Sequence, residues 1–250
     1  MEAGSLSIGL VVFVLVAISV GSLLKGMTGI GLPLIAVPAI ASLTSVEEAV
    51  ILMIIPVMGS NVWLVVTHAK YRSMIREHLP FLIAGFCGAV AGTLLLVTVD
   101  DRWLKLVLAV WLALYLIQYV LGDALHFIFR AKGAAAALLG SAAGVAHGAS
   151  GISVHIVAPY FHGRGLAPAR YAFLVAVSFL TTSSGQLVTA FGNQLLTADR
   201  LVIALLALVP TLFFTRMGVR YAGIVSQTVF NRIILALFVL MEIKLIADVL

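Results

Sequence analysis

Long apolar stretches dominate this chain and decide what it can fold into. Seven of them, each about 20 residues long, lie between charged and turn-forming residues, at 6–25, 46–67, 79–99, 103–121, 170–191, 200–219 and 228–248. A helix needs about 20 apolar residues to cross the roughly 30 Å hydrocarbon core of a bilayer, and it satisfies its backbone hydrogen bonds internally. Because 62% of the residues are hydrophobic and only 10% are charged, we expect an all-α polytopic membrane protein.

Three further apolar pieces are too short for an ordinary span. They cover 31–43, 134–147 and 152–161, and each lies beside a glycine-rich motif or ends near Pro38 or Pro159. At about 1.5 Å per residue, each covers half to two thirds of the hydrocarbon core. We therefore expect broken or re-entrant helices at these places.

Both halves of the chain show the same order of segments: a helix, a glycine-rich break, a short helix, one long span and two more spans. This order predicts two repeats of about five segments each, which we assign to 1–125 and 133–250. An odd number of segments turns the second copy upside down, an arrangement common in secondary transporters.

The basic residues indicate which side faces the cytoplasm, because short cytoplasmic loops carry most of the Lys and Arg. Ten segments place nine basic residues on one face and four on the other. Merging each broken pair into one span gives seven on each, with Arg232 counted and Lys25 unassigned. The nine are Lys70, Arg72, Arg76, Arg130, Lys132, Arg164, Arg170, Arg216 and Arg220, and the four are Arg102, Lys105, Arg200 and Lys244. The ten-segment count predicts that both termini lie outside the cytoplasm.

A short sequence motif occurs at both breaks, about 120 residues apart: Lys25-Gly26-Met27-Thr28-Gly29-Ile30 and His147-Gly148-Ala149-Ser150-Gly151-Ile152. The two copies share a basic residue, two glycines, a hydroxyl residue and Ile at matching places. Glycine permits the backbone conformations that a break requires, so we expect Gly26, Gly29, Gly31, Gly148 and Gly151 in unwound backbone. We expect Thr28 and Ser150 to be the N-caps of the short helices that follow.

Two helix N-termini that meet inside the membrane would form an anion site, because unpaired N–H groups and the positive ends of two dipoles point into it. Lys25 and His147 would add positive charge or hydrogen-bond donors. Each residue alone has a simpler explanation: Lys25 as a lysine that extends to the lipid headgroups, His147 as a packing histidine. Their matching places favour a shared function, and His147, roughly 21 Å along its helix, is expected to lie nearer the midplane than Lys25.

Polar side chains in the long spans after the breaks are candidates to line the same cavity. Asn61 in the first half and Gln186 in the second rank highest, because their amides cannot bond their own helix as small hydroxyls do. The predicted substrate-binding set is therefore Lys25, Gly26, Thr28, Gly29, Asn61, His147, Gly148, Ser150, Gly151 and Gln186.

The two glycine-rich breaks, each followed by a proline, and the spans after them resemble the TauE/SafE (TSUP) family of sulfite and organosulfonate transporters over essentially the whole chain. The resemblance implies a carrier for sulfite, sulfoacetate or another sulfonate in a bacterial or archaeal inner membrane. The chain departs from the glycine runs common in the family, with Gly29-Ile30-Gly31-Leu32-Pro33 and Gly151-Ile152-Ser153-Val154-His155 at its breaks. The resemblance therefore carries over to Gly26, Gly29, Gly148, Gly151, Pro38 and Pro159 for architecture.

Other classes of function remain as alternatives or are set aside. Gly148-Ala149-Ser150-Gly151 matches the serine motif of rhomboid intramembrane proteases, but Thr28 at the equivalent place favours a symmetric carrier. An anion channel lined by the same helix ends stays open. The basic residues form no run with interleaved aromatics, which argues against nucleic acid as a ligand.

We expect no cofactor, no metal and no catalytic residues. The expected partners are the anion, membrane lipids and, as an open option, a second copy of the chain. His147 is the residue through which transport would be coupled to a proton.

Overall fold

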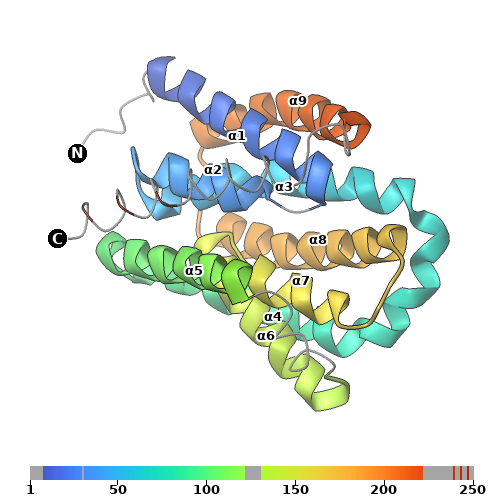
Figure 1. Ribbon diagram of the computed structural model, residues 1–250. Helices are drawn as coiled ribbons and strands as arrows, with labels where there is room; N and C mark the ends of the chain where they lie inside the picture. The colour runs from blue at the N-terminus through green and yellow to red at the C-terminus, as the bar shows by residue number, and fades with distance from the viewer. Residues whose placement is uncertain are drawn as a thin grey trace.

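The computed structural model describes residues 8–29, 31–121 and 131–221, together with Val239, Ile243 and Ala247. The helices within these ranges are α1 (Ile8–Thr28), α2 (Leu32–Ala41), α3 (Val46–Thr67), the 3₁₀ segment η1 (Ala69–His78), α4 (Leu79–Thr98), α5 (Asp101–Leu121), α6 (Gly133–Ser150), α7 (Val154–His162), α8 (Pro168–Gly192) and α9 (Ala198–Tyr221). They form an all-helical bundle, and the described part of the chain contains no strand (Figure 1).

Five helical segments of the described ranges are long and apolar enough to cross a membrane: Ile8–Thr28, Val46–Thr67, Ala69–Thr98, Pro168–Gly192 and Ala198–Tyr221. The expected span at 103–121 is helical as part of α5. The expected span at 228–248 lies outside the described residues, apart from three single positions. The protein is thus an all-α, polytopic membrane protein, as predicted.

Local sequence explains where several helices begin. Ser45 is the N-cap of α3, and its hydroxyl accepts the Glu48 N–H at 3.0 Å. Glu47 and Glu48 in the first turn complement the positive end of the α3 dipole. Helices α2, α4 and α8 each carry a proline in the first two positions, where a missing N–H removes no helical hydrogen bond.

The second half repeats the first at a constant interval of 122 residues. Helices α1 and α6 end at Thr28 and Ser150, α2 and α7 begin at 32 and 154, and α3 and α8 begin at 46 and 168. The long helices α3 and α8 are therefore equivalent elements, and they lie side by side. Two short helices of ten and nine residues follow the two breaks, as expected from the short apolar pieces.

Equivalent helices run in opposite directions. The start of α3 pairs with Arg200 of α9, directly after the end of α8. At its other end, α3 leads into η1, where Tyr71 packs edge-to-face on Phe173 in the first turns of α8 at 6.3 Å between centroids. The gradient of colour in Figure 1 shows the same opposition of α3 and α8. Helices α3 and α8 are thus antiparallel, as an inverted repeat requires.

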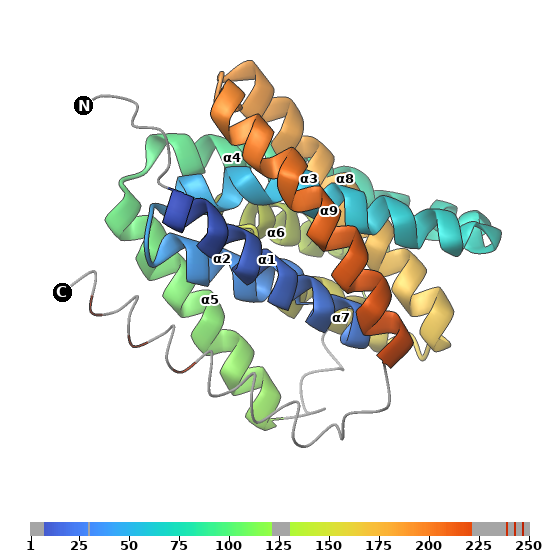
Figure 2. The same cartoon turned by 90° about the horizontal axis from the view of Figure 1, so that it is seen from above.

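Each helix that leads into a break packs against the other half of the chain. Helix α1 lies along α9, and α6 lies along α4, as Figures 1 and 2 show. The contacts are backbone to backbone: a β-carbon on Gly26 would overlap the Thr215 carbonyl oxygen, and one on Gly144 would overlap the Gly85 carbonyl oxygen. Small residues allow this close approach of membrane helices. The two repeats are therefore interlocked and are not two separate bundles.

Candidate functional site

Both breaks line one cavity between α1, α3 and α8. Its wall contains the first break and the start of α2, the second break and the start of α7, and three side chains of the long helices; the residues are Lys25, Gly29, Gly31, Pro33, Leu34, Val57, Asn61, Gly151, Ile152, Ser153, Val154 and Phe179. The empty space is about 330 Å³, including the part that leads to its mouth. At its widest point it admits about one water molecule. The structure thus brings the two repeated motifs together, as the sequence predicted.

Lys25 brings a positive charge into this cavity. Its side chain is 3% exposed, and its Nζ donates to Asn61 Oδ1 at 2.7 Å and to Ser60 Oγ at 2.9 Å. Both acceptors are neutral, and within the described ranges no carboxylate lies close enough to form a salt bridge with Nζ. An ammonium has three donors, so one proton and the whole charge remain uncompensated by these contacts.

The two acceptors are themselves held in place by the backbone of α3. Asn61 Nδ2 and Ser60 Oγ both donate to the Val57 carbonyl oxygen, each at 2.9 Å. Because the Asn61 amide nitrogen is bonded in this way, its oxygen is the atom turned toward Lys25. The ammonium is therefore oriented by two anchored groups and is not free to move along the wall.

His147 occupies the equivalent place in the second half. It is buried, its Nε2 lies 3.1 Å from Ser183 Oγ, and its Nδ1 lies 3.4 Å from Ser153 Oγ. Ser183 lies 36 residues after His147, and Asn61 lies 36 residues after Lys25, so the two contacts are equivalent in the repeat. His147 itself is not part of the cavity wall, whereas Ser153 is. The imidazole therefore reaches the cavity through a hydroxyl.

The glycines after each helix end make the breaks. Gly29 and Gly151 have φ of 82° and 70°, and their N–H groups donate to the Lys25 and His147 carbonyl oxygens, both at 2.7 Å. Gly31, the N-cap of α2, has a φ of 130°. These are conformations that L-residues with a β-carbon rarely adopt. The expectation of unwound backbone at Gly29 and Gly151 is confirmed.

The chain matches the family described as Sulfite exporter TauE/SafE over residues 13–245, nearly its whole length. The chain belongs to the TauE/SafE family. No curated protein and no solved structure matches it. The resemblance seen in the repeated motif is thus confirmed, and the family makes this a membrane transport protein for sulfur-containing anions.

Two assignments at the breaks of this TauE/SafE protein are wrong. Thr28 and Ser150 are not N-caps: they are the last residues of α1 and α6, and their hydroxyls donate backward to the Leu24 and Ala146 carbonyl oxygens at 2.9 and 2.7 Å. The helix continues to the glycine that can adopt a positive φ. The N-caps of α2 and α7 are Gly31 and Ser153, and neither provides a side-chain capping bond.

Gly26 and Gly148 are not unwound either. Both lie inside helices, where a β-carbon on Gly148 would overlap the Ala89 carbonyl oxygen of α4, as one on Gly26 would overlap the backbone of α9. These two glycines serve helix packing, and they turn toward a neighbouring backbone. Neither is part of the cavity wall.

Of the two basic residues, Lys25 lines the cavity directly, whereas His147 does not. Lys25 does not extend to the headgroups, because it is buried and bonded to α3. Gln186 donates its amide nitrogen to the His147 carbonyl oxygen at 2.7 Å, so it supports the second break. Thr28, Ser150 and Gln186 lie outside the cavity wall, while Lys25, Gly29, Asn61 and Gly151 line it.

Two of the wall residues that the sequence reasoning missed are Ser153 and Phe179, which lie beside His147. Ser153 follows Gly31 by 122 residues, so the repeat itself pointed to it once the interval was applied to every position of the break. Phe179 lies on α8 and tilts toward His147, with 5.8 Å between ring centroids. Among the described residues, no three His, Cys, Asp or Glu side chains gather as a metal site.

Proposed function

We propose that this TauE/SafE protein is a secondary carrier that binds sulfite or a small organosulfonate such as sulfoacetate in the cavity between its breaks. The proposal rests on the environment of Lys25: this cation is buried, and its hydrogen-bond acceptors, Ser60 and Asn61, are neutral. Removing an ion from water is expensive unless an opposite charge compensates it. A transported anion would supply that charge, and the Lys25 ammonium still has a donor to offer it.

The remaining contacts to the anion would come from both short helices. The starts of α2 and α7 line the same cavity, and helix N-termini favour negative charge through their N–H groups and dipoles. The Ser153 hydroxyl adds a donor beside His147. Sulfite and sulfonate groups present several oxygen acceptors, which suits a ring of separate donors around one ammonium.

Alternating access is favoured over an open pore by the size of the cavity and by the inverted repeat. The cavity is too narrow for a hydrated anion, so the surrounding helices would have to move, and paired breaks from opposite faces are typical of carriers. Because α1 packs on α9 and α6 packs on α4, we infer that the moving bodies combine elements of both halves. One body would contain α1 and α9, and the other would contain α4 and α6.

The protease alternative finds little support at Ser150. Its hydroxyl donates to the Ala146 carbonyl oxygen, and His147 lies beside the hydroxyls of Ser153 and Ser183. A serine nucleophile requires a base within hydrogen-bonding reach of its hydroxyl. The described contacts of Ser150 include no histidine, and the family is one of transporters.

Coupling to a proton is proposed through His147. A proton on this buried imidazole would add a second positive charge to the site that already holds Lys25. Such a charge is stabilised when the anion is present, since opposite charges in a poorly hydrated site attract strongly. The anion and the proton would therefore bind together and cross the membrane together.

The proposed location is a bacterial or archaeal inner membrane with both termini outside the cytoplasm. The ten-segment count and its nine basic residues on one face support this orientation. Helix α9 carries exposed apolar side chains, among them Val209 and Phe213, that suit contact with lipid or with a second copy.

Flux measurements on purified protein in liposomes test the proposal. We expect uptake of radiolabelled sulfite that saturates with concentration and is accelerated when unlabelled sulfite or sulfoacetate is loaded on the other side. Sulfate, oxalate and acetate serve as competing anions of other shapes. Counterflow distinguishes a carrier from a pore, so single-channel currents with no counterflow would establish the channel instead.

A further inference from the structure

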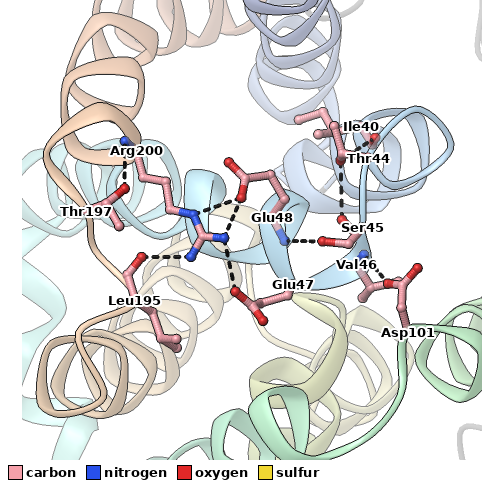
Figure 3. A network of polar contacts seen from close by, with 10 residues as sticks. All are labelled: Ile40, Thr44, Ser45, Val46, Glu47, Glu48, Asp101, Leu195, Thr197 and Arg200. Atoms are coloured by element: carbon pink, nitrogen blue, oxygen red, sulfur yellow. Dashed lines mark hydrogen bonds and ion pairs between the residues drawn. The ribbon is translucent and has the colours of Figure 1, made fainter. Parts of the chain in front are cut away.

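Arg200, in the first turn of α9, joins that helix to the start of α3 (Figure 3). Its Nη2 lies 3.0 Å from Glu47 Oε1 and 2.6 Å from Glu48 Oε2, and its Nε donates to Glu48 Oε2 at 2.8 Å. Its Nη1 donates to the Leu195 carbonyl oxygen at 2.9 Å, in the loop between α8 and α9. Branched contacts of this kind fix geometry more firmly than a single exposed ion pair. We name Arg200, Glu47 and Glu48 the latch.

The latch holds the far end of the short helix that begins at the first break. Helix α2 runs ten residues from the cavity to Ala41, and a four-residue turn then leads to Val46, where α3 begins. The Val46 N–H donates to Asp101 Oδ1 of α5 at 2.7 Å, as Figure 3 shows. The turn between α2 and α3 is thus tied to α5 on one side and, through the latch, to α9 on the other.

The opposite end of the α3 and α8 pair is closed by different chemistry. The positions equivalent to Glu48 and Arg200 in the repeat are Arg170 and His78. The acid–base pair of the latch is thus replaced by two basic residues. There, the Arg170 guanidinium lies 5.9 Å from the Tyr71 ring centroid, and Tyr71 packs against Phe173. Within the described ranges no ion pair crosses this end. Among the described residues, carboxylate–guanidinium ion pairs hold the latch end and not the aromatic end.

We propose that the latch is a gate: it keeps the cavity closed toward the face where α3 and α9 begin, and it must separate before the cavity opens to that face. This proposal rests on the alternating access proposed above. Separated charges at a partly exposed site regain water, so such a gate opens and closes reversibly. The aromatic end has no such compensation, since opening it exposes apolar rings.

The test measures access to the cavity without any substrate. A cysteine replaces Leu34, which lines the cavity at the start of α2, in a background where the natural Cys87 is changed to serine. A membrane-impermeant maleimide is applied to each face in turn, with oriented vesicles. We expect Arg200→Gln and the pair Glu47→Gln with Glu48→Gln to raise the labelling rate about three- to tenfold from the latch face only.

Lys105→Gln is the matched control, because it removes the Lys105–Asp101 ion pair of 3.1 Å that lies within the single helix α5. Its labelling rate should stay within twofold of the parent. The charge-reversed pair Glu48→Arg with Arg200→Glu should return the rate toward the parent value, which supports a gate. Arg200→Lys, which keeps the charge but loses the branched contacts, replaces Arg200→Gln if that variant does not fold.

Three results would overturn the gate: an unchanged rate in the latch variants, an equal rise in Lys105→Gln, or a rise from both faces. Because labelling needs no anion, its outcome is independent of the flux assay. A protein that shows the gate but no sulfite counterflow would refute the proposed function alone, and the reverse pattern would refute the gate alone.

Discussion

Replacing Lys25 with methionine removes the ammonium and keeps a side chain of similar length. Without an anion, the change relieves the burial of an uncompensated charge, worth several kcal/mol. It also leaves Asn61 Oδ1 without its donor at 2.7 Å, which costs about 1–3 kcal/mol. These effects oppose each other, so we expect the unfolding temperature of the anion-free protein to stay the same or rise.

With sulfite, the same variant should lose most of its ligand stabilisation. Deleting one member of a buried, hydrogen-bonded charge pair costs about 3–5 kcal/mol, at least a hundredfold in Kd. At a sulfite concentration of about 100 times the wild-type Kd, stabilisation is about 2.7 kcal/mol, and a hundredfold weaker Kd reduces it to about 0.4 kcal/mol. The anion-dependent rise in unfolding temperature should therefore nearly vanish.

The assay is thermal unfolding in detergent across a sulfite titration, with Lys105→Met as the control for loss of a lysine at a partly exposed ion pair. The control should keep the full anion-dependent shift. If Lys25→Met also keeps it, the anion does not bind at Lys25. If Lys25→Met unfolds many degrees lower without anion, the lysine is a structural residue and the reasoning from its neutral partners is wrong.

Further substitutions test the geometry of the breaks by thermal unfolding. Gly148→Ala and Gly26→Ala place a methyl group on a neighbouring backbone and should each destabilise by more than about 2 kcal/mol, whereas Gly9→Ala, with open space around it, should be neutral or stabilising by up to about 1 kcal/mol. Gly151→Ala should cost about 1–2 kcal/mol because of its positive φ, and Gly151→Asn should cost less; equal losses would contradict that cause. Gln186→Leu removes one of two hydrogen bonds to the His147 carbonyl oxygen, to which the Gly151 N–H still donates, and should cost about 0.5–1.5 kcal/mol; no loss at all would mean that the bond does not support the break.

The helical architecture followed from the sequence because each cause is local. Apolar length predicts a span, and a glycine between two apolar segments predicts a break, since only glycine adopts a positive φ without strain. Gly29 and Gly151 met that expectation at both breaks. The same order of segments in both halves then predicted the repeat.

The parts of the site that sequence reasoning missed depend on distant contacts. A hydroxyl residue before a glycine fits the end of one helix as well as the start of the next, so Thr28 and Ser150 were placed one element too late. The length of its helix suggested that Lys25 extends to the headgroups, but its Nζ instead donates to Asn61 of α3, 36 residues further on. Packing across the bundle, not local pattern, decides which basic residue reaches the cavity.

The packing of α1 on α9 and of α6 on α4 affects the order in which the protein is assembled. The contact of α6 with α4 forms within the chain's middle, so both helices are present soon after α6 is synthesised. The contact of α1 with α9 joins Gly26 to Gly218, about 190 residues later in the chain. We therefore expect the glycine face of α1 to lack its partner through most of synthesis, and the first motif of the cavity to be completed only after α9 is made.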